Sequence, residues 1–124
     1  MWSNSDHSKS KIETGSFYEA QAKQFLVNQG LIFIEQNVNF KTGELDLIMK
    51  HNKHLVFVEV RYRSSQDYGG AVTSITASKQ ARVRRAAQTY LQKHFGNRPP
   101  PCRIDVVAFE GANTKAIWIK NAFA

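Results

Sequence analysis

Carboxylates interrupt two segments with the composition of β-strands in the stretch GELDLIMKHNKHLVFVEVRYR (43–63). Glu44 and Asp46 stand in the first segment, and Glu59 stands in the second, two residues before Arg61. Because side chains alternate along a strand, Glu44 and Asp46 share one face, and Glu59 and Arg61 share one face. If these faces adjoin, Asp46, Glu59 and Arg61 converge, and the register between the strands decides whether they do.

The chemistry that suits this set is phosphodiester hydrolysis with a divalent metal ion. Two facing carboxylates repel each other unless a cation lies between them. Mg²⁺ prefers oxygen ligands, keeps several waters and is held by as few as one or two carboxylates. Such an ion polarises a phosphodiester and activates water, while Arg61 could stabilise the charge that develops on the phosphorus oxygens. Glu19, in a predicted helix, could orient the water or complete the metal shell.

The same residues also fit a purely structural interpretation. In antiparallel sheets with one solvent-facing side, charged residues alternate with apolar ones. Arg61 would then form an ion pair with Asp46 or Glu59, which contributes about a few tenths of a kcal/mol. Glu19 would be a solvated helix residue. Glu44 follows a turn, and we favour a role in capping the strand end over contact with a metal's water shell.

The elements that must position these residues follow from hydrophobic periodicity and turn residues. A polar segment over 1–14 is expected to be a flexible arm, followed by a helix over 16–29. A second helix is expected to be capped by Thr76 and to run to about Phe95. Strands are expected over 31–40, 44–50, 54–63, 102–109 and 115–121.

The order αβββαββ predicts an α/β domain with a mixed β-sheet flanked by helices. Short connections make the first three strands an antiparallel meander. The helix between the third and fourth strands permits a right-handed crossover that makes those two strands parallel. With 124 residues in the chain, residues 15–124 are expected to form a single domain.

Positive charge is concentrated in one part of the chain. The net charge is +7, and the interval between Asp67 and Asp105 contains no acidic residue. Its basic residues are Lys79, Arg82, Arg84, Arg85, Lys93, Arg98 and Arg103. This concentration favours a polyanionic partner, and nucleic acid in particular. Asp105, in a predicted strand, is expected to pair with a basic residue of the second helix.

Three of these basic residues would form one ridge on the second helix. Lys79, Arg82 and Arg85 recur every three residues. The start of that helix would flank the site that carries Arg61 and Arg63. Phosphate contacts from the ridge would position a duplex without reading its sequence. The alternative is an ordinary solvated helix face.

Composition excludes several other classes of protein. Cys102 is the only cysteine, so no intrachain disulfide can form. No apolar segment approaches the roughly 20 residues that span a bilayer, and no glycine-rich phosphate loop is present. We expect a soluble, cytoplasmic protein without a membrane partner.

The motifs together resemble those of the PD-(D/E)XK nuclease superfamily. In that superfamily an acidic residue on the second strand precedes an acidic-X-Lys triplet on the third, as Asp46 precedes Glu59-Val60-Arg61. Glu19 in the early helix resembles the arrangement in archaeal Holliday-junction resolvases. A closer resemblance is to the YraN-like family of small bacterial proteins, usually described as uncharacterised and endonuclease-like. It is carried by GSFYEAQAKQFL (15–26), GELDLI (43–48), LVFVEVRYR (55–63), SKQARVRRAAQTYL (78–91) and RIDVVAF (103–109).

This resemblance implies a restriction-endonuclease-like core and an Mg²⁺- or Mn²⁺-dependent endonuclease that acts on branched or structured DNA. Asp46 and Glu59 would bind the metal, together with the backbone carbonyl of Val60. Glu19 would be the helix carboxylate and Arg61 the cationic member of the catalytic set. The nucleic-acid-binding residues would be Arg63, Lys79, Arg82 and Arg85. DNA is favoured over RNA, and a homodimer is implied because junction-cutting relatives need paired active sites.

Arg61 departs from the superfamily pattern, which has lysine at this position. An arginine binds phosphate in a bidentate manner, but it cannot act as a neutral amine base. Two functions therefore remain open: a metal-dependent nuclease, and a non-catalytic nucleic-acid-binding domain on a nuclease fold. A protein-interaction domain is a third interpretation.

Overall fold

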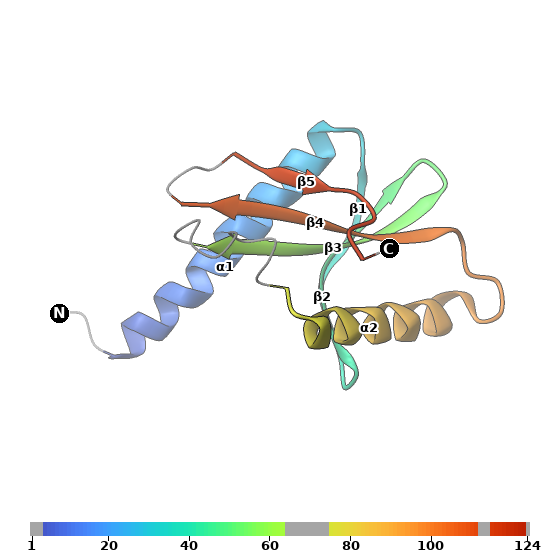
Figure 1. Cartoon of the computed structure of the whole chain (residues 1–124), viewed down its shortest axis with the longest axis horizontal. Helices are drawn as coiled ribbons and strands as arrows, with labels where there is room; N and C mark the ends of the chain where they lie inside the picture. The colour runs from blue at the N-terminus through green and yellow to red at the C-terminus, as the bar shows by residue number, and fades with distance from the viewer. Residues whose placement is uncertain (1–3, 64–74, 112–114, 124) are drawn as a thin grey trace.

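The computed structural model describes residues 4–63, 75–111 and 115–123, with side chains from residue 15 onward (Figure 1). Its elements follow the predicted order αβββαββ. They are α1 (Asn4–Asn28), β1 (Ile32–Phe40), β2 (Gly43–His51), β3 (His54–Arg63), α2 (Ala77–Phe95), β4 (Cys102–Glu110) and β5 (Ile117–Ile119). Thr76 caps α2 as predicted, because its side chain accepts a hydrogen bond from the backbone N–H of Lys79.

The five strands form one mixed sheet in the order β1-β2-β3-β4-β5. β1, β2 and β3 are an antiparallel meander, β3 and β4 are parallel, and β5 is antiparallel to β4. The α2 crossover links β3 to β4, which is the connection that parallel strands require. The predicted fold class is therefore confirmed.

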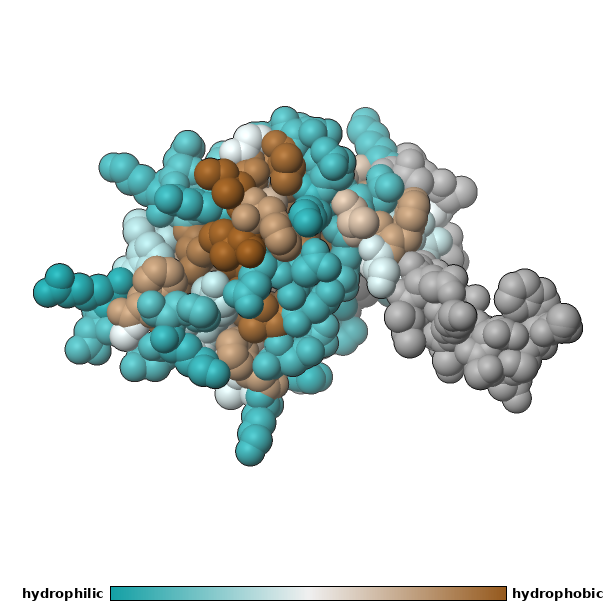
Figure 2. Space-filling model, turned by 180° about the vertical axis from the view of Figure 1, so that it is seen from behind, coloured by the Kyte–Doolittle hydropathy of each residue, from teal (hydrophilic) through white to brown (hydrophobic). Residues whose placement is uncertain are grey.

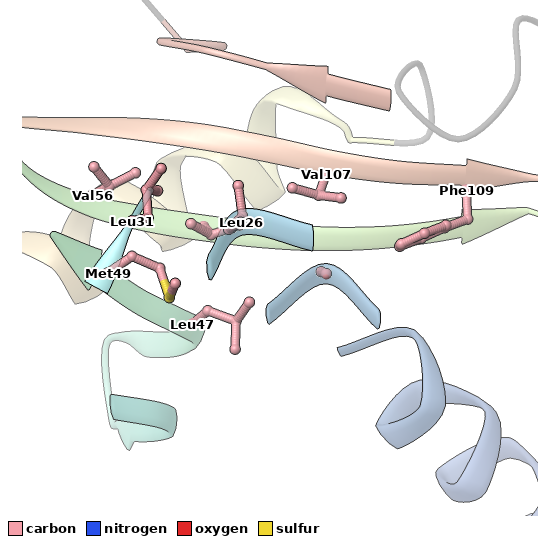
Figure 3. Close-up of a cluster of buried hydrophobic side chains, with 9 residues drawn as sticks. Leu26, Leu31, Leu47, Met49, Val56, Val107 and Phe109 are labelled. Atoms are coloured by element: carbon pink, nitrogen blue, oxygen red, sulfur yellow. The ribbon is translucent and has the colours of Figure 1, made fainter. Parts of the chain in front are cut away.

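The two helices cover opposite faces of the sheet. Ala22 and Leu26 of α1 pack on the face that carries Val56 and Val58 of β3 (Figure 3). The other face of β3 packs against α2, where Phe57 meets Tyr90 edge-to-face. Seen from behind, exposed apolar side chains form a patch surrounded by hydrophilic ones (Figure 2). Among the described residues, no helix combines the length and the apolar composition needed to cross a membrane.

The two ends of the chain differ from the sequence-based expectation. α1 begins at Asn4 rather than at residue 16, so it includes most of the range that was expected to be an arm. No proline interrupts residues 4–28, and the polar residues there are compatible with a helix. β5 is shorter than expected, because Asn121 adopts a positive φ of 52° and leaves the strand direction.

Asp105 pairs within the sheet and not with the second helix, so that prediction was wrong. Its fully buried carboxylate accepts hydrogen bonds from Arg103 Nε at 2.9 Å, Trp118 Nε1 at 3.0 Å and the Asn121 backbone N–H at 2.9 Å. Arg103 Nη2 also lies 2.8 Å from His51 Nδ1. Because a buried charge needs such partners, this network joins β4 and β5 to the end of β2.

The β1–β2 turn is held closely against α2. Gly43 starts β2 with φ +152°, and a Cβ atom there would lie 2.7 Å from the backbone oxygen of Arg82. Beside it, the hydroxyls of Thr42 and Thr89 are hydrogen-bonded at 3.0 Å. Only glycine permits this approach, since any larger residue would push the turn away from the helix.

We therefore expect Gly43→Ala to lower the free energy of unfolding by about 1–3 kcal/mol, through steric overlap and backbone strain. Urea denaturation would measure the loss. Gly30→Ala is a matched control, because Gly30 also has a positive φ, +99°, but nothing lies within 4 Å of its added Cβ. Equal losses of unfolding free energy in Gly43→Ala and Gly30→Ala would show that the close contact between Gly43 and Arg82 does not cause the loss of stability.

Candidate functional site

The candidate carboxylates gather where β2 separates from β3. Pairing between these strands ends with Leu47 opposite Val58. At the next residue of β2, Asp46 Oδ2 accepts a hydrogen bond from the backbone N–H of Val60 at 2.9 Å. A side chain thus satisfies a backbone donor at the point where the backbone ladder stops.

Glu59 and Arg61 lie side by side on β3. Arg61 Nη2 donates a hydrogen bond to Glu59 Oε1 at 2.9 Å. Glu59 is 4% exposed, while the side chain of Arg61 is 24% exposed. Among the described residues, Arg61 Nε is a buried polar atom with no hydrogen-bond partner. This nitrogen can donate to one further acceptor.

A cavity of about 210 Å³ opens over these side chains, between the two strands and α2. β2 contributes Glu44 and Asp46 to its lining, and β3 contributes Glu59 and Arg61. The α2 residues that line it are Lys79, Arg82 and Val83. Acidic groups on the strand side of the cavity therefore lie next to cationic groups on its helical side.

Glu19 lies beside this group but lines a neighbouring cavity of about 320 Å³, bordered by α1 and β1. Its side chain is hydrogen-bonded to Asn37, and its charge raises the pKa of both Asp46 and Glu59. Asn37 lies between the register pairs Gln36–Leu47 and Val38–Leu45, and so faces Asp46 across the strands. Glu19 is thus an electrostatic neighbour of Asp46 and Glu59, and its own side chain is hydrogen-bonded to a strand residue.

Asn37 was not anticipated from the sequence. Its φ of 53° is unusual within a strand. The available signal was its residue type, because asparagine is depleted in strands and tolerates left-handed backbone. An asparagine within an otherwise β-forming run is consistent with this local irregularity.

The other predicted nucleic-acid contacts do not all reach the carboxylates. Lys79 and Arg82 line the cavity. Arg85 lines a different cavity further along α2. Arg63 ends β3 opposite Glu110 of β4, outside the lining of the carboxylate cavity. The predicted ridge on α2 is therefore divided between two concave regions.

The electrostatic environment of Asp46 and Glu59 opposes ionisation of both carboxyl groups. Burial, and next the charge of Asp46, raise the pKa of Glu59 to about 8, although Arg61 lowers it. Burial also raises the pKa of Asp46 to about 6, against the lowering effect of the Val60 hydrogen bond. The two carboxyl groups therefore retain a proton near neutral pH unless a cation replaces it.

The donor set fits a cation that brings much of its own coordination shell. Within the described residues, no three His, Cys, Asp or Glu side chains are arranged to hold a metal ion. Asp46 and Glu59 offer carboxylate oxygens, which suit a hard ion that keeps its waters, as Mg²⁺ does. A closed site of the structural zinc type does not fit this donor set.

Comparisons with known proteins place this site in a family without an assigned activity. The family model described as "Uncharacterised protein family UPF0102" matches residues 18–109. The chain is 44% identical over 128 residues to a UPF0102 protein of Colwellia psychrerythraea, covering 99% of each chain. It is 49% identical over 112 residues to the UPF0102 protein YraN of Escherichia coli strain SMS-3-5, covering 90% of this chain and 84% of that relative. The Shigella sonnei protein of the same name matches to the same extent.

The raised pKa of Glu59 predicts that stability falls as pH rises. A carboxyl whose folded-state pKa is about 8, against an ordinary 4.5, binds its proton more tightly in the folded protein. The contribution of the protonated Glu59 carboxyl to the free energy of unfolding is fully present below about pH 4.5 and is lost as the pH rises towards 8. In buffer with EDTA, we expect the free energy of unfolding to fall by on the order of a few kcal/mol over this range.

Glu59→Gln should flatten this pH profile, which urea denaturation at several pH values would measure. Glu44→Gln is the comparison, because Glu44 raises the pKa of Glu59 less than burial or Asp46 does. Most of the decline should persist in that variant. A decline in Glu59→Gln as steep as in the wild type would show that Glu59 is not its source.

Proposed function

The chain belongs to the uncharacterised protein family UPF0102, and we propose that it is a metal-dependent endonuclease that hydrolyses DNA phosphodiester bonds. One observation carries this proposal. The partly buried Asp46 and the buried Glu59, both with raised pKa values, share a cavity with the cationic side chains of Arg61, Lys79 and Arg82. The buried Nε of Arg61 has no hydrogen-bond partner among the described residues. A divalent cation and a phosphate diester together would satisfy both halves of the cavity.

Asp46 and Glu59 are the residues that would hold Mg²⁺ or Mn²⁺, with the Val60 carbonyl as a further oxygen ligand. When bound, the ion would polarise the phosphate and lower the pKa of a water molecule. Asp46 would be kept in place by its hydrogen bond from the Val60 N–H, which lies at 2.9 Å. Binding would require both carboxyl groups to lose their protons, so affinity would rise with pH.

Arg61 would act on the phosphate through its charge. Its Nη2 is already bonded to Glu59, but its buried Nε has no partner among the described residues. A phosphate oxygen is a suitable acceptor, and the bond would strengthen as negative charge develops on that oxygen. Lys79 and Arg82 would hold neighbouring phosphates. Glu19, fixed by Asn37, would add negative potential that favours a cation.

The proposal extends to substrate and location. The resemblance to junction-resolving nucleases favours branched or structured DNA over RNA, and a homodimer that pairs two sites. The exposed single cysteine agrees with a cytoplasmic protein.

A second candidate function is non-catalytic binding of nucleic acid on the same fold. The specific observation in its favour is the Arg61–Glu59 ion pair at 2.9 Å, which occupies one carboxylate oxygen. An arginine fixed there would neutralise the acidic pair in place of a metal ion. The cavity would then bind phosphate without cutting it.

A cleavage assay separates the two functions. We expect labelled single-stranded, duplex, flapped or four-way DNA to be cut with Mg²⁺ or Mn²⁺ and not with EDTA. Asp46→Asn and Glu59→Gln should each lower the rate by at least about 100-fold, because each removes a charge that stabilises the transition state. Glu35→Gln is the matched control, since Glu35 accepts a hydrogen bond from Tyr90 and lies outside the cavity lining.

Undiminished cleavage by both site variants would refute the nuclease assignment. Cleavage by Arg61→Lys alone, with none by the wild type, would identify the arginine as the residue that silences the site. No cleavage by either protein, with DNA binding retained, would support the binding function.

Cation binding can be measured without any turnover. We expect Mn²⁺ or Mg²⁺ to raise the melting temperature of the wild type, more at pH 8 than at pH 6, because protons compete for the carboxylates. The rise should be absent in Asp46→Asn and retained in Glu35→Gln. An equal rise in all three proteins would place the bound cation elsewhere.

A further inference from the structure

A second concave region continues from the candidate site along α2. It is a shallow depression of about 450 Å³, open to solvent, and is lined by Thr42 from the β1–β2 turn together with residues of α2. The α2 residues are Arg85, Gln88, Thr89, Gln92 and Lys93. The preceding turns of the same helix carry Lys79 and Arg82, which line the carboxylate cavity.

The polar side chains of α2 form one continuous stripe through both regions. Arg82, Arg85, Thr89 and Lys93 are spaced by three or four residues, which places them on one side of a helix. At a rise of about 1.5 Å per residue, the stripe extends about 16 Å from Arg82 to Lys93. Since phosphates on one strand of a duplex are about 3.4 Å apart along the helix axis, this length corresponds to about five nucleotides.

The wall opposite the stripe is fixed before any ligand binds. Gly43 allows the β1–β2 turn to approach the Arg82 carbonyl. The Thr42 and Thr89 hydroxyls are hydrogen-bonded, and Thr89 Oγ1 donates to the Arg85 carbonyl at 3.0 Å. The region is therefore preorganised, which reduces the entropy lost on binding.

The charge of the stripe specifies an anionic ligand of extended shape. The sequence from residue 77 to 95 contains no Asp or Glu. Arg85 is exposed, and Lys93 Nζ lies 5.4 Å from the ring centroid of Phe40. A regularly charged strand would meet Arg85 and Lys93 in succession. At the other end of the stripe, the carboxylate pair would repel an acidic peptide but could accept a phosphodiester together with a cation.

We propose that Arg85 and Lys93, beside the hydrogen-bonded Thr42–Thr89 pair, form a second subsite, which binds the phosphate backbone of a DNA strand on one side of the carboxylate cavity. The assignment of the bound strand as substrate rests on the proposed nuclease function. Because the stripe leaves the cavity in one direction, the enzyme needs about three to five nucleotides on that side of the bond it cuts. Contacts to phosphates alone make this requirement independent of sequence.

Fluorescence anisotropy with labelled DNA in EDTA tests the subsite without catalysis. Arg85→Gln/Lys93→Gln removes two proposed phosphate contacts. The slope of log K against log salt should become shallower by about 1.8 on duplex, or about 1.4 on a single strand. Lys53→Gln/Lys120→Gln is the control with the same charge change. Lys53 lies in the β2–β3 turn, and Lys120 lies over Trp118, which packs on the α1 face.

An unchanged slope in Arg85→Gln/Lys93→Gln, or an equal change in the control, would overturn the subsite. A competition experiment tests whether the subsite is specific for nucleic acid. If poly-glutamate of matched charge displaces labelled DNA from the wild type as readily as unlabelled DNA does, the ligand is not nucleic acid in particular.

Cleavage assays with substrates shortened from either end distinguish failure of the subsite proposal from failure of the proposed nuclease function. The rate should fall when nucleotides are removed from one side only, and the double variant should lose that dependence. If the wild type does not cut but the slope changes as expected, the subsite stands and the nuclease function fails. If the wild type cuts and the double variant binds and cuts equally well, the subsite alone fails.

Discussion

The separation of β2 from β3 beyond Leu47 is the constraint on which the rest of the site depends. Continued pairing would give the Val60 N–H a backbone partner and leave the Asp46 carboxylate without this donor. Instead, the Asp46 carboxylate takes the Val60 N–H as its partner, and the cavity opens over that bond. The same bond therefore satisfies the backbone and fixes the partly buried Asp46 carboxylate. Loss of the Asp46 oxygen would leave a backbone donor unsatisfied as well as remove a site residue.

Burying two carboxyl groups at this position opposes stability. Removing them from water disfavours their charged forms, and Arg61 compensates only in part, since the pKa of Glu59 remains raised to about 8. Asp105 shows the contrast within the same sheet: it is equally buried but accepts hydrogen bonds from three residues. The Asp105 network is complete in the folded chain, whereas the proposed cation would relieve the repulsion between Glu59 and Asp46. That difference separates a structural carboxylate from a candidate functional one.

Much of this arrangement could be predicted from local sequence patterns, because it depends on local preferences. Alternation placed Glu59 beside Arg61, and the Thr76 cap and the bounds of β3 were predicted correctly. The pattern failed where tertiary packing overrides the strand period. Strict alternation would place Leu45 on the face of Leu47, but Leu45 packs with Ile48 against α2. The role of Asn37 and the division of the α2 ridge also depend on how separate elements meet, which no local pattern encodes.

The arginine at position 61 determines where acid–base capacity can lie. A lysine so close to a buried carboxyl could exchange its proton, but a guanidinium keeps its charge at any pH the protein experiences. Protons and cations then compete directly for Asp46 and Glu59, whose raised pKa values place that competition near neutral pH. In the proposed nuclease, a proton released during hydrolysis would go to one of these carboxyl groups, to the nearby Glu44 or Glu19, or to solvent, and Arg61 would contribute charge and hydrogen bonds.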